Sequence, residues 1–159
     1  MKSLKPSWIR QSGSNVVRLV PCGGRKDVVN SMPSELQRCI GAGGHTTLMV
    51  WADCDDNCPD GDALKALFWR EAERQGITRE QFDDVVFVFP KDRLENWIEF
   101  LRTGITDEAN EGPRVKNRDA ANAARKLAEM CEAGGSVTGM PPSLLWSCKN
   151  WRVLVQKFR

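Results

Sequence analysis

Apolar runs alternate with amphipathic stretches along the chain. The apolar runs predict three short strands, over 15–21, 46–53 and 84–90. The second and third runs are continuous enough to be buried on both faces, as strands of parallel sheets are. Apolar residues at helical spacing predict longer helices, over 24–44, 61–76, 91–104, 114–135 and 143–158. A short helix is predicted after Thr78, because Gln81 stands three residues later as in a capping box.

This order of elements predicts an α/β fold in three layers. The sheet is expected to be short and mostly parallel, with helices on both faces and a helical C-terminal extension. A chain of 159 residues is most simply one domain, 1–159. Carboxyl ends of parallel strands meet at one edge. The polar loops that follow the predicted strands, at 22–27, 53–58 and 90–96, are therefore expected to converge.

The net charge of +2 hides an uneven distribution of charge. Lys and Arg outnumber acids seven to two in residues 1–50, acids outnumber them sixteen to seven in 51–111, and the basic excess returns in 112–159. A carboxylate cluster between basic ends suits a metal-assisted site for phosphate esters. Solvated helix faces are the alternative explanation.

The six cysteines are scattered and contain no CxxC pair, so we expect reduced and mostly buried thiols. Cys54 and Cys58, with His45 upstream, form the only conceivable zinc half-site, and a second ligand pair is missing. No apolar run approaches the roughly 20 residues that span a bilayer. The expected location is the cytoplasm, with no membrane partner.

The run LMVWADCDD ends in three carboxylates, Asp53, Asp55 and Asp56. Asp53 and Asp55 project to the same side if the extended chain continues through Cys54. Neighbouring carboxylates form a hard-oxygen site suited to Mg²⁺ or Mn²⁺. The alternative is an acidic turn, in which a carboxylate only caps the next helix.

The ADCDD strand end, followed by a helix, a strand and a helix carrying RLENWIEFL, resembles small, divergent members of the Toprim superfamily. That superfamily includes catalytic domains of topoisomerases, primases and nucleases of the overcoming-lysogeny-defect type. The resemblance covers about 15–104, with the basic helical segment at about 113–159 as an extension. It implies metal-dependent cleavage of DNA or RNA, with Asp53, Asp55 and Asp56 at the metal. It also implies a prokaryotic, phage or mobile-element setting, often anti-phage defence.

The turn after the first predicted strand departs from the Toprim pattern. Toprim domains usually carry a Glu there, whereas this turn reads PCGGRKD. Asp27 is the candidate acid/base in its place. Glu95 is the other candidate, because small Toprim-like proteins often carry a Glu in a context similar to LENWI. For Glu95, favourable placement in the first turn of a helix is the alternative.

Three basic residues are candidate phosphate ligands. Arg25 and Lys26 follow two glycines at a helix start, where backbone N–H groups and side chains can cradle a phosphate. The glycines could instead simply make a tight turn. Lys116 stands near the start of a basic helix from which it could reach a site, and an exposed solvated face is the alternative.

The leading interpretation is metal-dependent phosphodiester cleavage in nucleic acid. The competing interpretation is a catalytically inactive Toprim-like module that binds nucleic acid or a partner protein. Both interpretations are compatible with a homo-oligomer. A receiver-like regulator is a third class. Lys91 suits a receiver, but the PCGG turn lacks the acidic pair that a receiver needs after its first strand.

Overall fold

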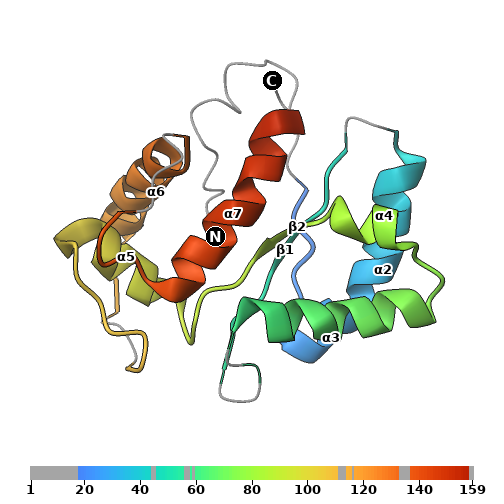
Figure 1. The fold of residues 1–159 in the computed structure, drawn as a ribbon, viewed down its shortest axis with the longest axis horizontal. Coiled ribbons are helices and arrows are strands. Elements are labelled where there is room, and N and C mark those ends of the chain that lie inside the picture. Colours follow the sequence, from blue (N-terminus) through green and yellow to red (C-terminus); the bar gives the residue numbers. More distant parts are fainter. Residues whose placement is uncertain are drawn as a thin grey trace.

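The computed structural model describes residues 18–43, 46–55, 58, 60–110, 114–115, 117–132 and 137–157. These residues form a small mixed α/β protein of six helices and two strands (Figure 1). The helices are α2 Arg25–Gly41, α3 Gly61–Arg74, α4 Arg79–Asp83, α5 Leu94–Thr103, α6 Asn117–Glu132 and α7 Pro142–Lys157. The strands are β1 Met49–Trp51 and β2 Val86–Val88. Within the described ranges, no helix combines the length and apolarity needed to cross a membrane.

The two strands pair in parallel, with Met49 opposite Val86. Hydrogen bonds continue the pairing beyond both strands. The amide of Cys54 donates to the carbonyl of Pro90 at 2.8 Å, and the amide of Asp92 donates to the carbonyl of Cys54 at 2.8 Å. The carboxyl ends of the two strands therefore finish together at one edge of the sheet.

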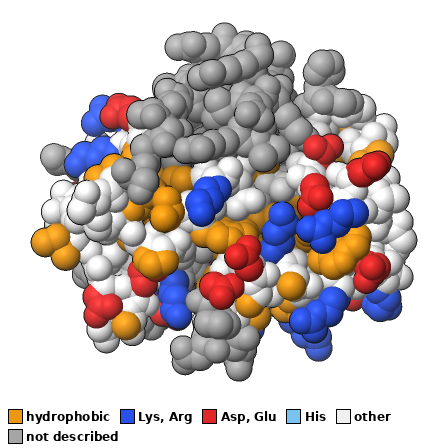
Figure 2. All heavy atoms as spheres, viewed as in Figure 1, with side chains coloured by type: hydrophobic (Ala, Val, Ile, Leu, Met, Phe, Trp, Pro, Cys, Tyr) orange, Lys and Arg blue, Asp and Glu red, His pale blue; other side chains and the backbone are white. Residues whose placement is uncertain are grey.

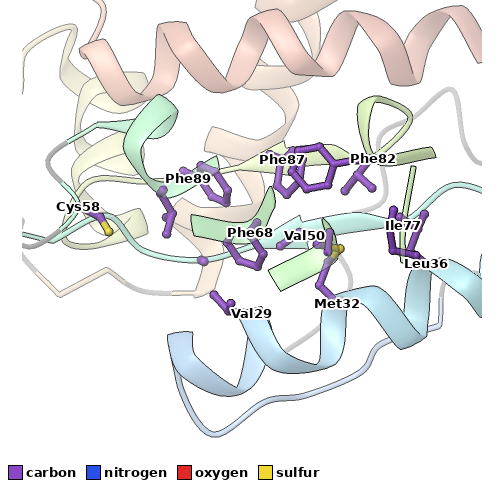
Figure 3. Close-up of a cluster of buried hydrophobic side chains, with 14 of the residues drawn as sticks. Val29, Met32, Leu36, Val50, Cys58, Phe68, Ile77, Phe82, Phe87 and Phe89 are labelled. Atoms are coloured by element: carbon purple, nitrogen blue, oxygen red, sulfur yellow. The ribbon is translucent and has the colours of Figure 1, made fainter. Parts of the chain in front are cut away.

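One face of the sheet packs against α2, α3 and α4. Val50 of β1 and Phe87 of β2 lie in this core with Phe68 and Phe82, all at most 4% exposed. Figure 3 shows side chains of α2, including Met32, pointing from below toward Val50 and the phenylalanine rings. Burial of each large apolar side chain contributes about 1.5–3 kcal/mol, which makes this cluster a main source of stability.

The other face packs against α5, α6 and α7. Val86 and Val88, which alternate with Phe87 along β2, are buried there with Trp97 and Leu144. Helix α7 lies close against β2, where the Ser147 hydroxyl accepts a hydrogen bond from the amide of Phe89 at 3.0 Å. Helices thus cover both faces of the sheet, and the C-terminal helical segment is part of the core (Figure 1).

The first predicted strand, 15–21, is wrong within its described part. Residues 18–21 form no strand, and Leu19 and Val20 are 64% and 44% exposed. Arg18 interrupts the apolar run and Pro21 has no amide hydrogen to give a ladder. The described sheet therefore has two strands where the sequence predicted three.

The other predicted elements are confirmed, with shorter strands than expected. The start of α3 is capped by Asp60, whose Oδ1 accepts from the amide of Ala63 at 2.7 Å. Thr78 and Gln81 form the predicted capping box of α4. Gly104 ends α5 in a left-handed conformation with φ of 82°, which glycine adopts without steric cost.

Candidate functional site

The predicted convergence of polar loops is found at the carboxyl edge of the sheet. Arg25, at the start of α2, lies beside Asp55, with 2.6 Å between Nη1 and Oδ1. Cys54 pairs with Lys91 after the two strands. The start of α2, the segment after β1 and the segment after β2 therefore lie side by side, although they are far apart in the sequence.

Asp53 and Asp55 lie in different surroundings. Ala52 and Cys54 are buried in the core beside α2 and α3, so the strand alternation directs Asp53 to the opposite side, toward α5. Asp55 lies instead on the α2 side, where it meets Arg25. The ladder ends at Cys54, and the amide of Cys58 donates to the carbonyl of Asp55 at 2.9 Å. The chain turns at Asp55, so the expected shared projection of these two carboxylates does not occur.

The charged groups that act on Asp53 are two carboxylates and one guanidinium. Partial burial raises the pKa of Asp53, and the nearby charges of Glu95 and Asp92 raise it further, whereas Arg93 lowers it. Glu95 belongs to the first turn of α5. The fold therefore brings Asp53 and Glu95 near enough for their charges to interact, and these two residues are called the carboxylate pair below.

A tight turn between β2 and α5 brings the start of α5, with Glu95, close to the end of β1. Asp92 adopts a left-handed φ of 56°, the one positive φ among the described non-glycine residues, and aspartate tolerates this conformation better than most residues. The amide of Arg93 donates to the carbonyl of Lys91 at 2.6 Å. This turn connects β2 to α5 within a few residues and positions Glu95.

The remaining predicted site residues differ in their placement. Asp27 is exposed in the first turn of α2, and a Cβ added at Gly23 would lie 2.8 Å from its Oδ2. The Asp27 carboxylate therefore lies against the glycine turn. Lys26 is exposed beside Arg25. Asp56 and Lys116 lie outside the described residues.

A groove of about 550 Å³ separates α2 from α3, with Asp55 among its lining residues. Its charged lining residues are four cations and two carboxylates, namely Arg25, Lys26, Arg70, Arg74, Asp55 and Glu71. Arg70 and Arg74 were missed in the sequence, where their spacing of four on an amphipathic helix indicates only a shared face. Figure 2 shows basic, acidic and hydrophobic side chains intermixed over α3 and α4, so the described residues form no uniformly basic face in this view.

Comparison with models of protein families, with curated proteins and with solved structures finds no match to this chain. Function is therefore inferred from the geometry of the edge and the groove.

The carboxylate pair is chemically suited to a hydrated divalent cation. Among the described residues, no group of three or more His, Cys, Asp or Glu side chains is arranged to hold a metal. Mg²⁺ commonly uses only one or two protein carboxylates and completes its shell with waters and phosphate oxygens. Asp53 and Glu95 fit this requirement, because the charge of Glu95 raises the pKa of Asp53 and a cation would relieve that repulsion.

Cys54 is unsuited to act as a nucleophile. Its side chain is 1% exposed, and burial together with the neighbouring Cys58 raises its thiol pKa to about 12. A thiol with this pKa stays protonated at neutral pH, whereas nucleophilic attack needs the thiolate. The described cysteines are free thiols, and Cys54 and Cys58 are buried, but Cys22 is exposed and Cys39 and Cys148 are half-buried, so the prediction of mostly buried thiols holds only in part.

Proposed function

We propose that this protein is a Toprim-like domain that binds nucleic acid and cleaves its phosphodiester bonds with the help of Mg²⁺ or Mn²⁺. The observation that carries the proposal is the pairing of Cys54 with Lys91 after the two strands, which brings Asp53 and the turn before Glu95 to one edge of the sheet. Carboxylates brought together from separate elements at the carboxyl edge of a parallel sheet occur where sites form in α/β folds. The cations Arg25 and Lys26, which line the groove together with Asp55, suit a polyanionic substrate.

Asp53 and Glu95 would hold the metal ion in this proposal. The ion would polarise the scissile phosphate and lower the pKa of a bound water. Asp55 holds the Arg25 side chain by an ion pair and so positions a cation beside the phosphate. Asp27 is the candidate acid/base, and Asp56 and Lys116 stay candidates for the metal and the phosphate.

A second function, binding without cleavage, is favoured by two observations. The turn at Gly23 and Gly24 carries no Glu, which Toprim catalysis usually uses. Asp55 is engaged by Arg25, so one of the expected metal carboxylates is already paired with a cation. In this alternative, the chain recognises nucleic acid or a partner protein with the same surface.

Calorimetric titration with Mg²⁺ and Mn²⁺ separates the two functions when combined with cleavage assays on single-stranded and duplex DNA and RNA. The test variant is Asp53→Asn with Glu95→Gln. The matched control, Glu73→Gln with Glu80→Gln, removes the same charge from exposed positions on α3 and α4. We expect ion binding and cleavage in wild type and control, and neither in the test variant. Nucleic-acid binding by the wild type without ion binding or cleavage would establish the binding-only function.

A further inference from the structure

The groove between α2 and α3 contains positive charge that the carboxylate edge does not use. Arg25 and Lys26 line it from α2, and Arg70 and Arg74 line it from α3. The volume of about 550 Å³ falls in the range of sites that bind small molecules or parts of larger ligands. Cations from two helices thus face the same space.

The four cations differ in how their charge is compensated. Arg25 pairs with Asp55 at 2.6 Å, and Arg74 pairs with Glu71 through Nη2 at 2.6 Å and Nε at 3.0 Å. Lys26 and Arg70 have neither an ion pair nor a hydrogen bond to any residue that the structure describes. The net positive charge of the groove therefore resides on Lys26 and Arg70.

This pattern favours a ligand that carries several phosphates. A guanidinium has five N–H donors, so Arg25 and Arg74 keep donors for a ligand while their acidic partners hold them in place. Uncompensated cations on both walls would neutralise successive negative charges. Val29 and Leu67 add an apolar part to the lining, suited to the sugar portion of a nucleotide.

We propose that the α2–α3 groove binds the phosphate backbone of a nucleic-acid strand, with Lys26 and Arg70 as its main contacts. Asp55, which follows β1, also lines the groove, so a strand in the groove continues toward the carboxyl edge. The choice of a nucleic acid rests on the proposed function. Binding in the groove does not require cleavage.

The test measures the fluorescence anisotropy of a labelled 20-nucleotide single strand with the full chain in EDTA, at salt concentrations from 50 to 200 mM. The test variant is Lys26→Gln with Arg70→Gln. The control, Lys149→Gln with Arg125→Gln, removes the same charge from exposed positions on α7 and α6. The conservative variant, Lys26→Arg with Arg70→Lys, keeps the charge.

We expect the test variant to bind about tenfold more weakly at 0.1 M salt, because it loses two phosphate contacts. The slope of log K against log salt should fall by about 1.4, since each lost contact to a single strand changes it by about 0.7. The control and conservative variants should stay within about twofold of wild type. The single variant Arg70→Gln, at an exposed position, should change the slope by about half as much as the double variant. It tests the assignment even if the double variant folds poorly.

Equal losses in the test and control variants would overturn the groove assignment, and so would a wild type that does not bind the strand. Displacement of the strand by pyrophosphate at equal phosphate concentration would overturn the strand assignment in favour of free phosphate. A cleavage assay with Mg²⁺ tests the proposed function separately. Intact groove-dependent binding without cleavage would remove the catalytic proposal and leave the groove assignment in place.

Discussion

The Nη1 atom of Arg25 lies 2.6 Å from Oδ1 of Asp55 and joins the start of α2 to the turn after β1. The hydrogen bond from Arg25 to Asp55 raises the pKa of the guanidinium. Both side chains keep contact with solvent, at 26% and 46% exposure. An exposed pair contributes at most about 1 kcal/mol, so its main effect is to hold Arg25 at the groove.

Asp55→Asn should separate this positional effect from stability. We expect the free energy of unfolding to fall by less than about 1 kcal/mol. Loss of the carboxylate leaves the Arg25 charge uncompensated, so nucleic-acid binding in EDTA should tighten about threefold to tenfold. Denaturant titration and anisotropy measure the two effects. The control is Asp83→Asn, which removes a carboxylate that pairs with Lys65 and Arg79. Equal tightening in both variants would contradict a local effect.

Asp53→Asn should stabilise the protein in a manner that depends on pH. Burial, followed by the charge of Glu95, raises the native-state pKa of Asp53 above its ordinary value of 3.8. The native state therefore holds this proton more tightly than the unfolded chain. The wild type loses stability relative to Asp53→Asn as the pH rises from 3.8 through the native-state pKa.

Denaturant titration across acidic to neutral pH checks this expectation. The free energy of unfolding of Asp53→Asn should exceed that of wild type by less than about 1 kcal/mol at neutral pH, since the Asp53 side chain is only partly buried and solvent screens its charge. The difference should vanish below pH 3.8. Glu73→Gln, an exposed position on α3, serves as the control and should show no comparable dependence. A stability gain that persists at low pH would mean that the effect is unrelated to ionisation.

Gly61→Ala should destabilise the contact between α3 and α7. A Cβ at residue 61 would lie under 3.0 Å from three atoms of the Trp146 indole. That indole stacks on Phe89 at 5.1 Å between centroids and donates from Nε1 to Asp62 at 2.9 Å. Moving the ring should cost about 1–3 kcal/mol. Gly41→Ala, where the added atom meets nothing within 4 Å, should leave the unfolding midpoint unchanged or slightly raised.

Ser143→Ala should remove a partly buried group of hydrogen bonds that joins three segments of the chain. The Ser143 hydroxyl accepts from Trp97 Nε1 at 2.7 Å and from the Lys91 amide at 3.2 Å, and it donates to Glu108. Loss of the hydroxyl leaves the Trp97 donor without its acceptor, at a cost of about 1–3 kcal/mol. Ser34→Ala, which removes only a local bond to the Ser31 carbonyl, should change the unfolding free energy by less than about 0.5 kcal/mol. Similar costs for both variants would argue against a role for this group of hydrogen bonds.

Thiol alkylation should distinguish buried from exposed cysteines. Cys54, with a pKa of about 12 and 1% exposure, should resist iodoacetamide near pH 8 in the folded protein, whereas the exposed Cys22 should react. Peptide mass spectrometry measures the extent at each site. Labelling in denaturant is the control and should modify both. Rapid modification of Cys54 under native conditions would contradict the burial.

Local patterns were sufficient for most elements of the fold. Apolar continuity marked β1 and β2, and Thr78 with Gln81 marked the start of α4, because strand burial and capping involve residues close in sequence. The apolar run at Leu19 and Val20 led to a wrong strand prediction, because the local pattern does not show whether a neighbouring strand is present. An apolar run becomes a strand only when a neighbouring strand offers it hydrogen bonds, and the described part of this run lies exposed.

The composition of the candidate site was visible in the sequence, but its pairings were not. Asp53, Asp55, Glu95 and Arg25 were all candidates, yet Asp55 contacts Arg25 and Asp53 lies under the influence of the Glu95 charge because the ladder ends at Cys54 and the chain turns there. Arg70 belongs to a groove only because α2 packs across from α3. Residue types and helical or strand periodicity can be read from a short stretch of sequence. Which charged side chains of distant segments lie together depends on how the folded chain packs.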